Sequence, residues 1–507
     1  MVYKATHLVA TAAIFITCNV AVAVAVAVAA EAEAEAAVKL GSLFQDHMVL
    51  QRGVAVPVWG QAEAGEQVTV NFAGQVKRAK ASADGKWRVT LSSLDASAVG
   101  REMLISGEKG DAITLSDVVV GEVWVCSGQS NMAFRVGAVK EIRPLIKTQK
   151  HIRSFDVENT VSLKEESAVA GEWRSRGSNS AVAFTFSYFL QKELDVPVGI
   201  ILTSWGSSSI EGWMPRDMTD ELPHFKDIMN RFDSNEELGQ DLEDILKKGK
   251  DRTPPEDIKL RTQPNIIYNA MMKPIIPFAC RGIVWYQGEA NAMNIEDMTQ
   301  YGSSLPAWIE RYRKEWGQED FHFLGVMLPG FAKKSGKVID GEDPSLISWA
   351  YMREAQLKAL TLKNTGIVTT IDLGHVTDIH PKDKLPIGQR LALLAQRDVY
   401  GMDVLAEGPV LKEVTQEGAK LVVHYDHAEG LETKHGRPPR AFWVADDSQE
   451  WKLANAVVNE QTVVLSSPEI KKPLYVRYAF SAIPDVNLVN KAGLPARPFR
   501  TDQFTTK

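Results

Sequence analysis

The sequence predicts an α/β protein in which a parallel sheet with helices on both faces is flanked by β-rich modules at both ends. Three observations support this prediction. Between residues 118 and 400, apolar segments rich in β-branched residues alternate with amphipathic segments. The regions before and after contain short strand-like runs separated by turn residues. The 507 residues are also enough for several domains.

Residues 1–30 have the pattern of a secretory signal peptide. Lys4 precedes an uncharged run from Leu8 to Ala30, and small residues in A-x-A spacing close that run. We expect cleavage near Ala29 or Ala30, which implies a secreted or periplasmic protein. The alternative is an uncleaved anchor, because about 20 apolar residues can span a membrane. Membrane association is therefore expected only if this segment is retained.

Residues 38–117 predict an N-terminal β-rich domain. The short runs "MVLQ", "VAVPVWG", "EQVTVNFAG", "KWRVTL" and "EMLISG" contain β-forming residues, and turn residues separate them.

Residues 118–400 predict the α/β domain. Its strand candidates are "VVVGEVWVC", "VPVGIILTSW", "CRGIVWYQG", "HFLGVML" and "TGIVTTIDLG". Its helix candidates include "AFTFSYFLQKEL", "LPAWIERYRKEW" and "WAYMREAQLKALTL". The charged, helix-prone segment at about 215–264 is expected to leave the sheet, either as a cap over a site or as a solvated insertion.

Residues 401–507 predict a C-terminal β-rich domain, because the β pattern returns in "KLVVHYD", "RAFWVAD", "TVVLSS" and "LYVRYAF".

Composition narrows the possible functions. The formal net charge is −7 and provides no basic surface for nucleic acid. Cys18 lies in the signal segment, and two buried thiols at Cys126 and Cys280 are favoured over a disulfide. The dense histidine cluster in the C-terminal domain lacks a convincing set of metal ligands; its members are His424, His427 and His435.

Polar residues follow four of the predicted strands. The segments are 128–131 (GQSN), 203–213 (TSWGSSSIEGW), 287–292 (QGEANA) and 378–381 (DIHP). Each segment could be an ordinary turn or helix cap. Because open α/β sheets bind ligands at the carboxyl ends of their strands, we expect the four segments to converge on one site.

Together these segments supply the groups of an acyl-transfer site. A serine hydroxyl is a weak nucleophile until a base removes its proton. Histidine suits that task because its pKa lies near neutrality. A nearby carboxylate can orient the imidazole, and backbone or asparagine N–H groups can stabilise the oxyanion that forms when an ester is attacked.

The four segments resemble the sequence blocks of the SGNH (GDSL-type) hydrolase superfamily. "GQSNM", "TSWGSSSIEGW", "WYQGEANA" and "DIHPKDKLPIGQRLA" are most similar to those of sialate O-acetylesterases and related bacterial carbohydrate acetylesterases. "LFQDHMVLQR" and "NKAGLPARPFRTD" extend the resemblance over nearly all of residues 38–502. The resemblance implies an SGNH-type, flavodoxin-like catalytic domain at residues 118–400.

The resemblance also implies individual roles. Ser130 is the implied nucleophile and His380 the implied base, while Gly206 and Asn291 are implied oxyanion donors together with the Ser130 N–H. Four further residues of these blocks are expected to bind substrate: Gln129, Trp205, Gln287 and Glu289.

The acid that orients His380 is the point of departure from the family pattern. The usual block is Asp-x-x-His, but Thr377 occupies the aspartate position here. Asp378, two residues before the histidine, is our choice. Asp372, Glu289 or a backbone carbonyl are the alternatives.

The implied activity is removal of O-acetyl groups from carbohydrate, first of all O-acetylated sialic acid, through an acetyl-serine and without metal or organic cofactor. A first alternative is deacetylation of a plant or algal polysaccharide such as xylan. A second is a non-catalytic carbohydrate-binding protein, for which Trp205, Trp213 and Tyr286 would stack on sugar rings.

Overall fold

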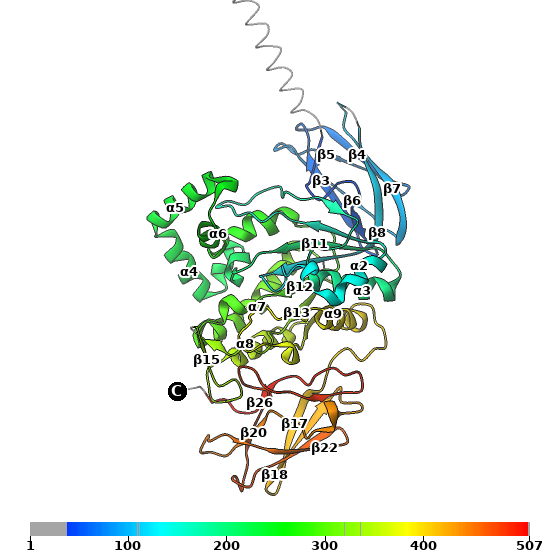
Figure 1. Cartoon of the computed structure of the whole chain (residues 1–507). Helices are drawn as coiled ribbons and strands as arrows, with labels where there is room; N and C mark the ends of the chain where they lie inside the picture. The colour runs from blue at the N-terminus through cyan, green and yellow to red at the C-terminus, as the bar shows by residue number, and fades with distance from the viewer. Residues whose placement is uncertain (1–37, 109, 111, 319, 335, 505–507) are drawn as a thin grey trace, which may run out of the picture.

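The computed structural model describes residues 38–504 except 109, 111, 319 and 335. The expected signal peptide therefore lies outside the described residues. Figure 1 shows an N-terminal β module, a central α/β domain and a C-terminal β module following one another along the molecule. No helix in the described part of the chain is long and apolar enough to cross a membrane. The predicted α/β class with flanking β-rich modules is confirmed.

The N-terminal module consists mainly of antiparallel strands whose inward residues alternate with exposed ones, and its strand β2 pairs in parallel with β8 (Ile113–Gly128). In β6, for example, Trp87, Val89 and Leu91 are buried and the residues between them are exposed. The strands are β1 (Lys39–Leu40), β2 (Val49–Gln51), β3 (Val56–Gln61), β4 (Gln67–Phe72), β5 (Gln75–Lys80), β6 (Lys86–Leu91) and β7 (Ser97–Ser106). Strand β3 lies between β1 and β6, and β4 lies between β5 and β7.

Strand β8 (Ile113–Gly128) joins this module to the central domain without interruption. Its first half pairs with β7, and its second half pairs with two strands of the central sheet. The expected boundary at residues 117–118 therefore falls inside a continuous strand. Glu122, fully buried in β8, binds Arg52 of the N-terminal module at 2.6 Å and Arg281 of the central domain at 2.9 Å.

The central sheet has the order β10-β9-β11-β8-β12-β13-β16, and every neighbouring pair from β9 to β16 is parallel. Its further strands are β9 (Ile152–Asp156), β10 (Trp173–Arg174), β11 (Val198–Ser204), β12 (Gly282–Tyr286), β13 (His322–Val326) and β16 (Thr365–Val368). Strands β11, β12 and β13 are buried along their whole length, as expected of a sheet covered on both faces. Strand β9 and the edge strand β10 were not among the predicted strands.

Helices cover both faces of this sheet. Trp124 of β8 packs edge-on against Phe186 of α3, whereas Trp285 of β12 packs against Trp308 of α7. In the sheet register Trp285 lies beside Ser127, an odd number of residues from Trp124, so the two tryptophans point to opposite faces. The helices of this domain are α2 (Arg143–Thr148), α3 (Ala181–Leu194), α7 (Ile295–Trp316), α8 (Trp349–Leu357) and α9 (Leu385–Asp398).

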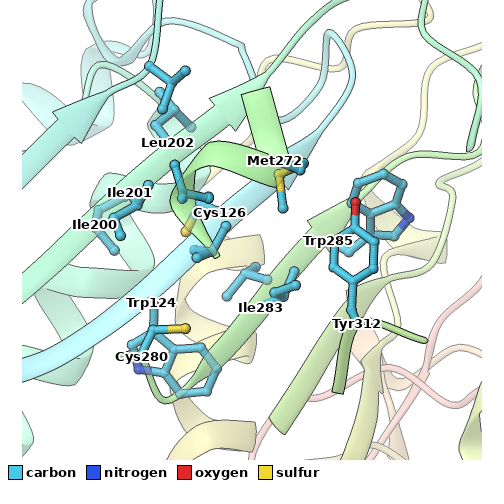
Figure 2. Packing of buried hydrophobic residues seen from close by; sticks show 14 of the residues in the cluster. Trp124, Cys126, Ile200, Ile201, Leu202, Met272, Cys280, Ile283, Trp285 and Tyr312 are labelled. Carbon is cyan, nitrogen blue, oxygen red and sulfur yellow. The ribbon is translucent and has the colours of Figure 1, made fainter. Parts of the chain in front are cut away.

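Both described cysteines lie in the apolar core as free thiols, as expected. Figure 2 shows them among side chains of β8, β11 and β12. Burial raises the pKa of both the Cys126 and the Cys280 thiol, so neither is poised to react as a thiolate.

The segment at 215–264 contains three helices outside the sheet, visible on the left in Figure 1. They are α4 (Pro223–Asp233), α5 (Glu236–Lys247) and α6 (Pro254–Arg261). Helix α6 starts with a capping box between Thr253 and Glu256. The guanidinium of Arg261 lies 5.9 Å from the Trp205 ring, so this segment covers one side of the second polar strand end.

The C-terminal module packs two four-stranded antiparallel sheets around its own apolar core, which includes Val423, Val444, Val463 and Tyr478. One sheet is β17 (Val410–Glu417), β18 (Lys420–Asp426), β23 (Thr462–Ser466) and β22 (Asn455–Asn459). The other is β21 (Lys452–Leu453), β20 (Phe442–Ala445), β24 (Tyr475–Tyr478) and β26 (Phe499–Arg500). Strand β19 (Glu432–Thr433) pairs with β25 (Leu488–Val489), and a hairpin of β14 (Lys333–Lys334) and β15 (Lys337–Val338) projects from the central domain.

Candidate active site

Ser130 lies in a turn directly after β8, between the ends of β11 and β12. Ser204 and Tyr286 are both in register with Gly128, so three strands end at the same level. A Cβ at Gly128 would come within 2.1 Å of the Tyr286 carbonyl oxygen, which explains the glycine at this position. From β8 the chain runs first to β9 and β11 on one side and later to β12 on the other. Ser130 therefore lies where the strand order reverses, the place at which open α/β sheets bind ligands.

His380 meets Ser130 although 250 residues separate them. The Nε2 atom of His380 lies 2.8 Å from Ser130 Oγ. Both residues are half-buried, so the pair is open to a ligand. This distance is that of a nucleophile and its general base.

Asp378 is close to His380 but does not bind its ring. The Asp378 carboxylate accepts a hydrogen bond from the main-chain N–H of His380 at 2.9 Å. Within the described residues, the ring Nδ1 of His380 has no hydrogen-bond partner. His375 fixes the same loop, because its Nδ1 accepts from the main-chain N–H groups of Thr377 and Asp378. Asp378 thus holds the loop and places a negative charge beside the imidazole.

The two competing carboxylates are engaged elsewhere. Asp372 forms a bidentate pair with Arg390 at 2.7 and 2.8 Å. Burial raises its pKa, but Arg390 and Lys434 outweigh burial, so the pKa of Asp372 is lowered overall. Glu289 binds the side chain of Asn131. Neither carboxylate contacts the imidazole of His380.

Gly206 lies against the nucleophile, as the oxyanion prediction requires. A Cβ at this position would come 3.3 Å from Ser130 Cβ, a tight contact that a glycine avoids. In the described part of the chain, the N–H groups of Ser130 and Gly206 donate to no protein acceptor. Two neighbouring unsatisfied N–H groups beside a nucleophile can receive a developing oxyanion.

Asn291 occupies η8 (Glu289–Asn291), directly after β12, and its amide orientation is fixed. Its Oδ1 accepts from the Ile210 N–H at 3.0 Å and from Gln287 Nε2 at 2.9 Å. Its Nδ2 lies 3.0 Å from both carboxylate oxygens of the buried Glu211. The amide nitrogen carries two N–H groups, and among the described residues its acceptor is the Glu211 carboxylate alone.

All four residues expected to bind substrate, Gln129, Trp205, Gln287 and Glu289, are buried in this conformation. Gln129 Oε1 accepts from Gln287 Nε2 and from the Ala290 N–H, both at 3.2 Å, which links two strand ends. Trp205 is only 4% exposed and lies beneath Arg261 of α6. Trp213 and Tyr286 are fully buried. The expectation that these aromatic rings stack on a sugar is therefore wrong for this conformation, because none presents an open face.

A buried network beneath the Ser130–His380 pair was not anticipated. Asn131 donates to Glu289 and, at 3.0 Å, to the carbonyl of Ile379. Its Oδ1 accepts from Lys384, whose Nζ lies 5.2 Å from the ring centroids of both Phe134 and Tyr286. The residue after the nucleophile therefore binds the residue before the base, and this tie holds the two catalytic segments together.

The charges of this network set the protonation of the base. Burial lowers the pKa of His380, the Lys384 ammonium lowers it further, and Asp378 opposes both. Burial lowers the pKa of Lys384 to about 8, although Glu289 and two aspartates oppose the change. Burial raises the pKa of Glu289. A lowered histidine pKa keeps the imidazole neutral, which is the form that accepts a proton from serine.

Sequence reasoning missed Asn131, Lys384 and Glu211 as functional residues. All three lie inside the quoted blocks: Asn131 follows the nucleophile, Lys384 follows the His-Pro pair, and Glu211 is the acid of the "SSSIEGW" segment. A signal was present for Glu211, since a charged residue between Ile210 and Gly212 is rarely buried without a partner, whereas Asn131 is uncharged and Lys384 follows two charged residues. Among the described residues, no group of three His, Cys, Asp or Glu side chains could hold a metal ion.

Comparisons with known proteins agree with this geometry. The sequence profile of the family described as carbohydrate esterase, sialic acid-specific acetylesterase, matches residues 120–246 and 259–396, slightly more than half of the chain. A profile described as a flagellar system-associated repeat matches residues 405–469 of the C-terminal module.

Full-length relatives are similar across all three modules. The chain is 26% identical to mouse sialate O-acetylesterase over 88% of this chain and 90% of that protein. It is 25% identical to the human sialate O-acetylesterase, with coverages of 91% and 92%. The crystal structure of a carbohydrate acetylesterase from Xanthomonas citri superposes with a TM-score of 0.78 at 31% identity, covering 92% of this chain and 100% of that one.

Fold, site and relatives together define a carboxylic ester hydrolase. More specifically, the chain belongs to the carbohydrate esterase family of sialic acid-specific acetylesterases.

Proposed function

We propose that this protein removes O-acetyl groups from carbohydrate through an acetyl-Ser130 intermediate on an SGNH-type catalytic domain. The observation that carries the proposal is the 2.8 Å contact between Ser130 Oγ and His380 Nε2 at the carboxyl ends of the parallel strands. The family profile supports O-acetylated sialic acid as the substrate.

In the first half of the reaction, Ser130 Oγ attacks the acetyl carbonyl carbon and its proton passes to His380 Nε2. The carbonyl oxygen becomes an oxyanion that the N–H groups of Ser130 and Gly206 and the second N–H of Asn291 stabilise. When this intermediate collapses, the bond between the carbonyl carbon and the sugar oxygen breaks. The sugar oxygen takes the proton from His380, which leaves acetyl-Ser130.

In the second half, His380 removes a proton from water and the resulting hydroxide attacks the acetyl-serine carbonyl. The same donors stabilise the second oxyanion. The bond to Ser130 Oγ then breaks, His380 returns the proton to the serine, and acetate leaves. Each half therefore needs the imidazole in its neutral form at the start, which the lowered pKa of His380 supports.

Ser130→Ala tests the nucleophile. This variant removes one half-exposed oxygen, so we expect it to fold normally and to lose kcat on an acetyl ester by a factor on the order of 10⁴ or more. A serine-reactive phosphonate should label the wild-type protein at Ser130, as read by peptide mass spectrometry. Label on another residue, or substantial activity in the variant, would show that the nucleophile is misassigned.

Acetate release from a panel of O-acetylated sialic acids and hemicelluloses tests the substrate. We expect the acetylated sialic acids to be hydrolysed with the higher kcat/KM. A preference for acetylated xylan would favour the polysaccharide alternative, and no acetate release from any member would favour a binding protein.

The proposal includes export, because Lys4 and the apolar run that follows it have the pattern of a signal peptide. N-terminal sequencing of the mature protein should find a new terminus near residue 30. An intact N-terminus on a membrane-bound protein would indicate an anchor.

A further inference from the structure

A pocket beside the catalytic pair is formed mainly by apolar side chains. Its cavity volume is about 110 Å³. Its walls include Met293, Met298, Phe331, Ile347 and Trp349. The rings of Phe331 and Trp349 pack against each other with centroids 4.7 Å apart. An apolar hollow of this size exceeds what the methyl of an acetyl group fills.

The pocket adjoins the catalytic site through residues next to the catalytic pair. Ile379, which precedes the base His380, lines it, and so does Glu289. Both residues bind Asn131, which follows the nucleophile. Asn131 and Ile379, which directly follow Ser130 and precede His380 in the sequence, therefore connect the pocket to the two catalytic residues.

Two features indicate that the pocket receives a ligand. Glu289 is 4% exposed, and its Oε2 has no hydrogen-bond partner among the described residues, whereas its Oε1 binds Asn131. Met293, which also lines the pocket, is 68% exposed and so lies at its open side. A few polar groups among mainly apolar walls are typical of a small-molecule site.

We propose that this pocket is the subsite for the sugar ring that carries the acetyl ester, a role that rests on the proposed function. The apolar face of the ring packs against Phe331 and Met293, since the electron-rich face of an aromatic ring attracts C–H groups. A ring hydroxyl reaches the carboxyl of Glu289. The subsite thus binds the leaving group of the first half-reaction and leaves the acetyl carbonyl at Ser130.

The test compares two substrates on the same variants. Phe331→Ala and Met293→Ser remove apolar wall without adding charge, and Val457→Ser is a matched control, because Val457 is 63% exposed on the C-terminal module. For each variant we measure kcat/KM on an O-acetylated sugar, either O-acetylated sialic acid or acetylated xylo-oligosaccharide. The second substrate is p-nitrophenyl acetate, whose leaving group is not a sugar. Thermal unfolding checks that each variant is folded.

We expect the ratio of kcat/KM for the sugar ester to that for p-nitrophenyl acetate to fall about tenfold in Phe331→Ala and severalfold in Met293→Ser, mainly through a higher KM. The ratio should stay within twofold in Val457→Ser. If kcat/KM falls in proportion on both substrates, or if the ratio is unchanged in both pocket variants, the proposed subsite is wrong, while the esterase function is unaffected. If the wild-type protein hydrolyses neither substrate, the proposed function is wrong and the subsite falls with it.

Discussion

The two flanks of Ser130 are built in different ways. On the side of Asn291, the amide is bound by Ile210, Gln287 and Glu211, and the group is almost completely buried. On the side of His380, the imidazole has one hydrogen-bond partner in the part of the chain that the structure describes, Ser130, and it lies half-exposed in a loop. One flank is nearly saturated with hydrogen bonds, whereas the other keeps unused bonding capacity.

Asn291 is a group whose position is fixed by its hydrogen bonds, whereas His380 is a group whose hydrogen bonds change during the reaction. An oxyanion donor works best when its direction is fixed before the reaction, because no free energy is then needed to orient it. A general base must take up and release a proton twice in each cycle, and its neighbours must accommodate both protonation states. We therefore expect substitutions on the two flanks to change kcat, KM and the pH profile differently.

The largest effect is expected on the histidine flank. His380→Ala should reduce kcat/KM on an acetyl ester by a factor on the order of 10⁴. Asp378→Asn should cost far less, because an asparagine oxygen can still accept from the main-chain N–H of His380. Steady-state kinetics on both variants at several pH values provides the measurement.

Asp372→Asn and Glu289→Gln serve as references for this pair. If Asp378→Asn is as inactive as His380→Ala, the carboxylate binds the imidazole during the reaction and completes an orthodox triad. A larger loss in either reference variant would transfer the orienting role to that residue.

An intermediate effect is expected on the asparagine flank. Asn291→Ala should reduce kcat by a factor of about 10² to 10³, since it removes one oxyanion donor. Glu211→Gln should lose less, because the glutamine oxygen can still accept from Asn291 Nδ2 while the charge disappears. Both should change kcat more than KM, because the interaction forms only with the oxyanion.

Rates for a second acetyl ester separate this interpretation from general damage. Equal increases in KM with unchanged kcat would contradict an oxyanion role for Asn291. A Glu211→Gln variant less active than Asn291→Ala would mean that the carboxylate has a role of its own.

The smallest effect concerns the pH profile. The Lys384 ammonium lowers the pKa of His380, and Lys384 is protonated in the acidic range because its own pKa is about 8. Lys384→Met removes this positive charge, so the pKa of His380 should rise. The acidic limb of kcat/KM should then move to higher pH by about half a unit.

Asp378→Asn provides the opposite control, because loss of its negative charge should lower the pKa of His380 and move the same limb to lower pH. Limbs that move in the same direction in both variants would contradict the electrostatic explanation. A purely structural loss in Lys384→Met would lower the rate at every pH without moving the limb.

Much of the fold followed from apolar periodicity. The runs that became β11, β12 and β13 are buried on both faces and contain few polar residues, so their pattern was unambiguous. Strand β9 was missed because "IRSFD" includes Arg153 and Asp156 and resembles a polar loop. Its membership in the sheet comes from pairing with β11, which no local pattern encodes.

The site could be anticipated by residue type but not by bonding. Parallel strands bring their carboxyl ends to one edge, so the convergence of Ser130, Gly206 and Asn291 followed from the topology. The partner of Asp378 could not be foreseen, because it depends on how His375 folds the loop onto its own main chain. Trp205 is buried and has the guanidinium of Arg261 over its ring, a neighbour from a separate segment of helices that the sequence around Trp205 does not indicate.

Strand β8 has a consequence for how the molecule assembles. As the chain is synthesised, β8 emerges as the last strand of the N-terminal module, whose partner β7 is already present. Its second half then offers a pre-positioned edge to which β11 and later β12 are added. Ser130 thus follows a strand that is already paired with the N-terminal module before most of the catalytic domain has been synthesised. A chain cut between residues 117 and 118 would divide β8, lose part of its pairing with β7 and expose an unpaired strand end.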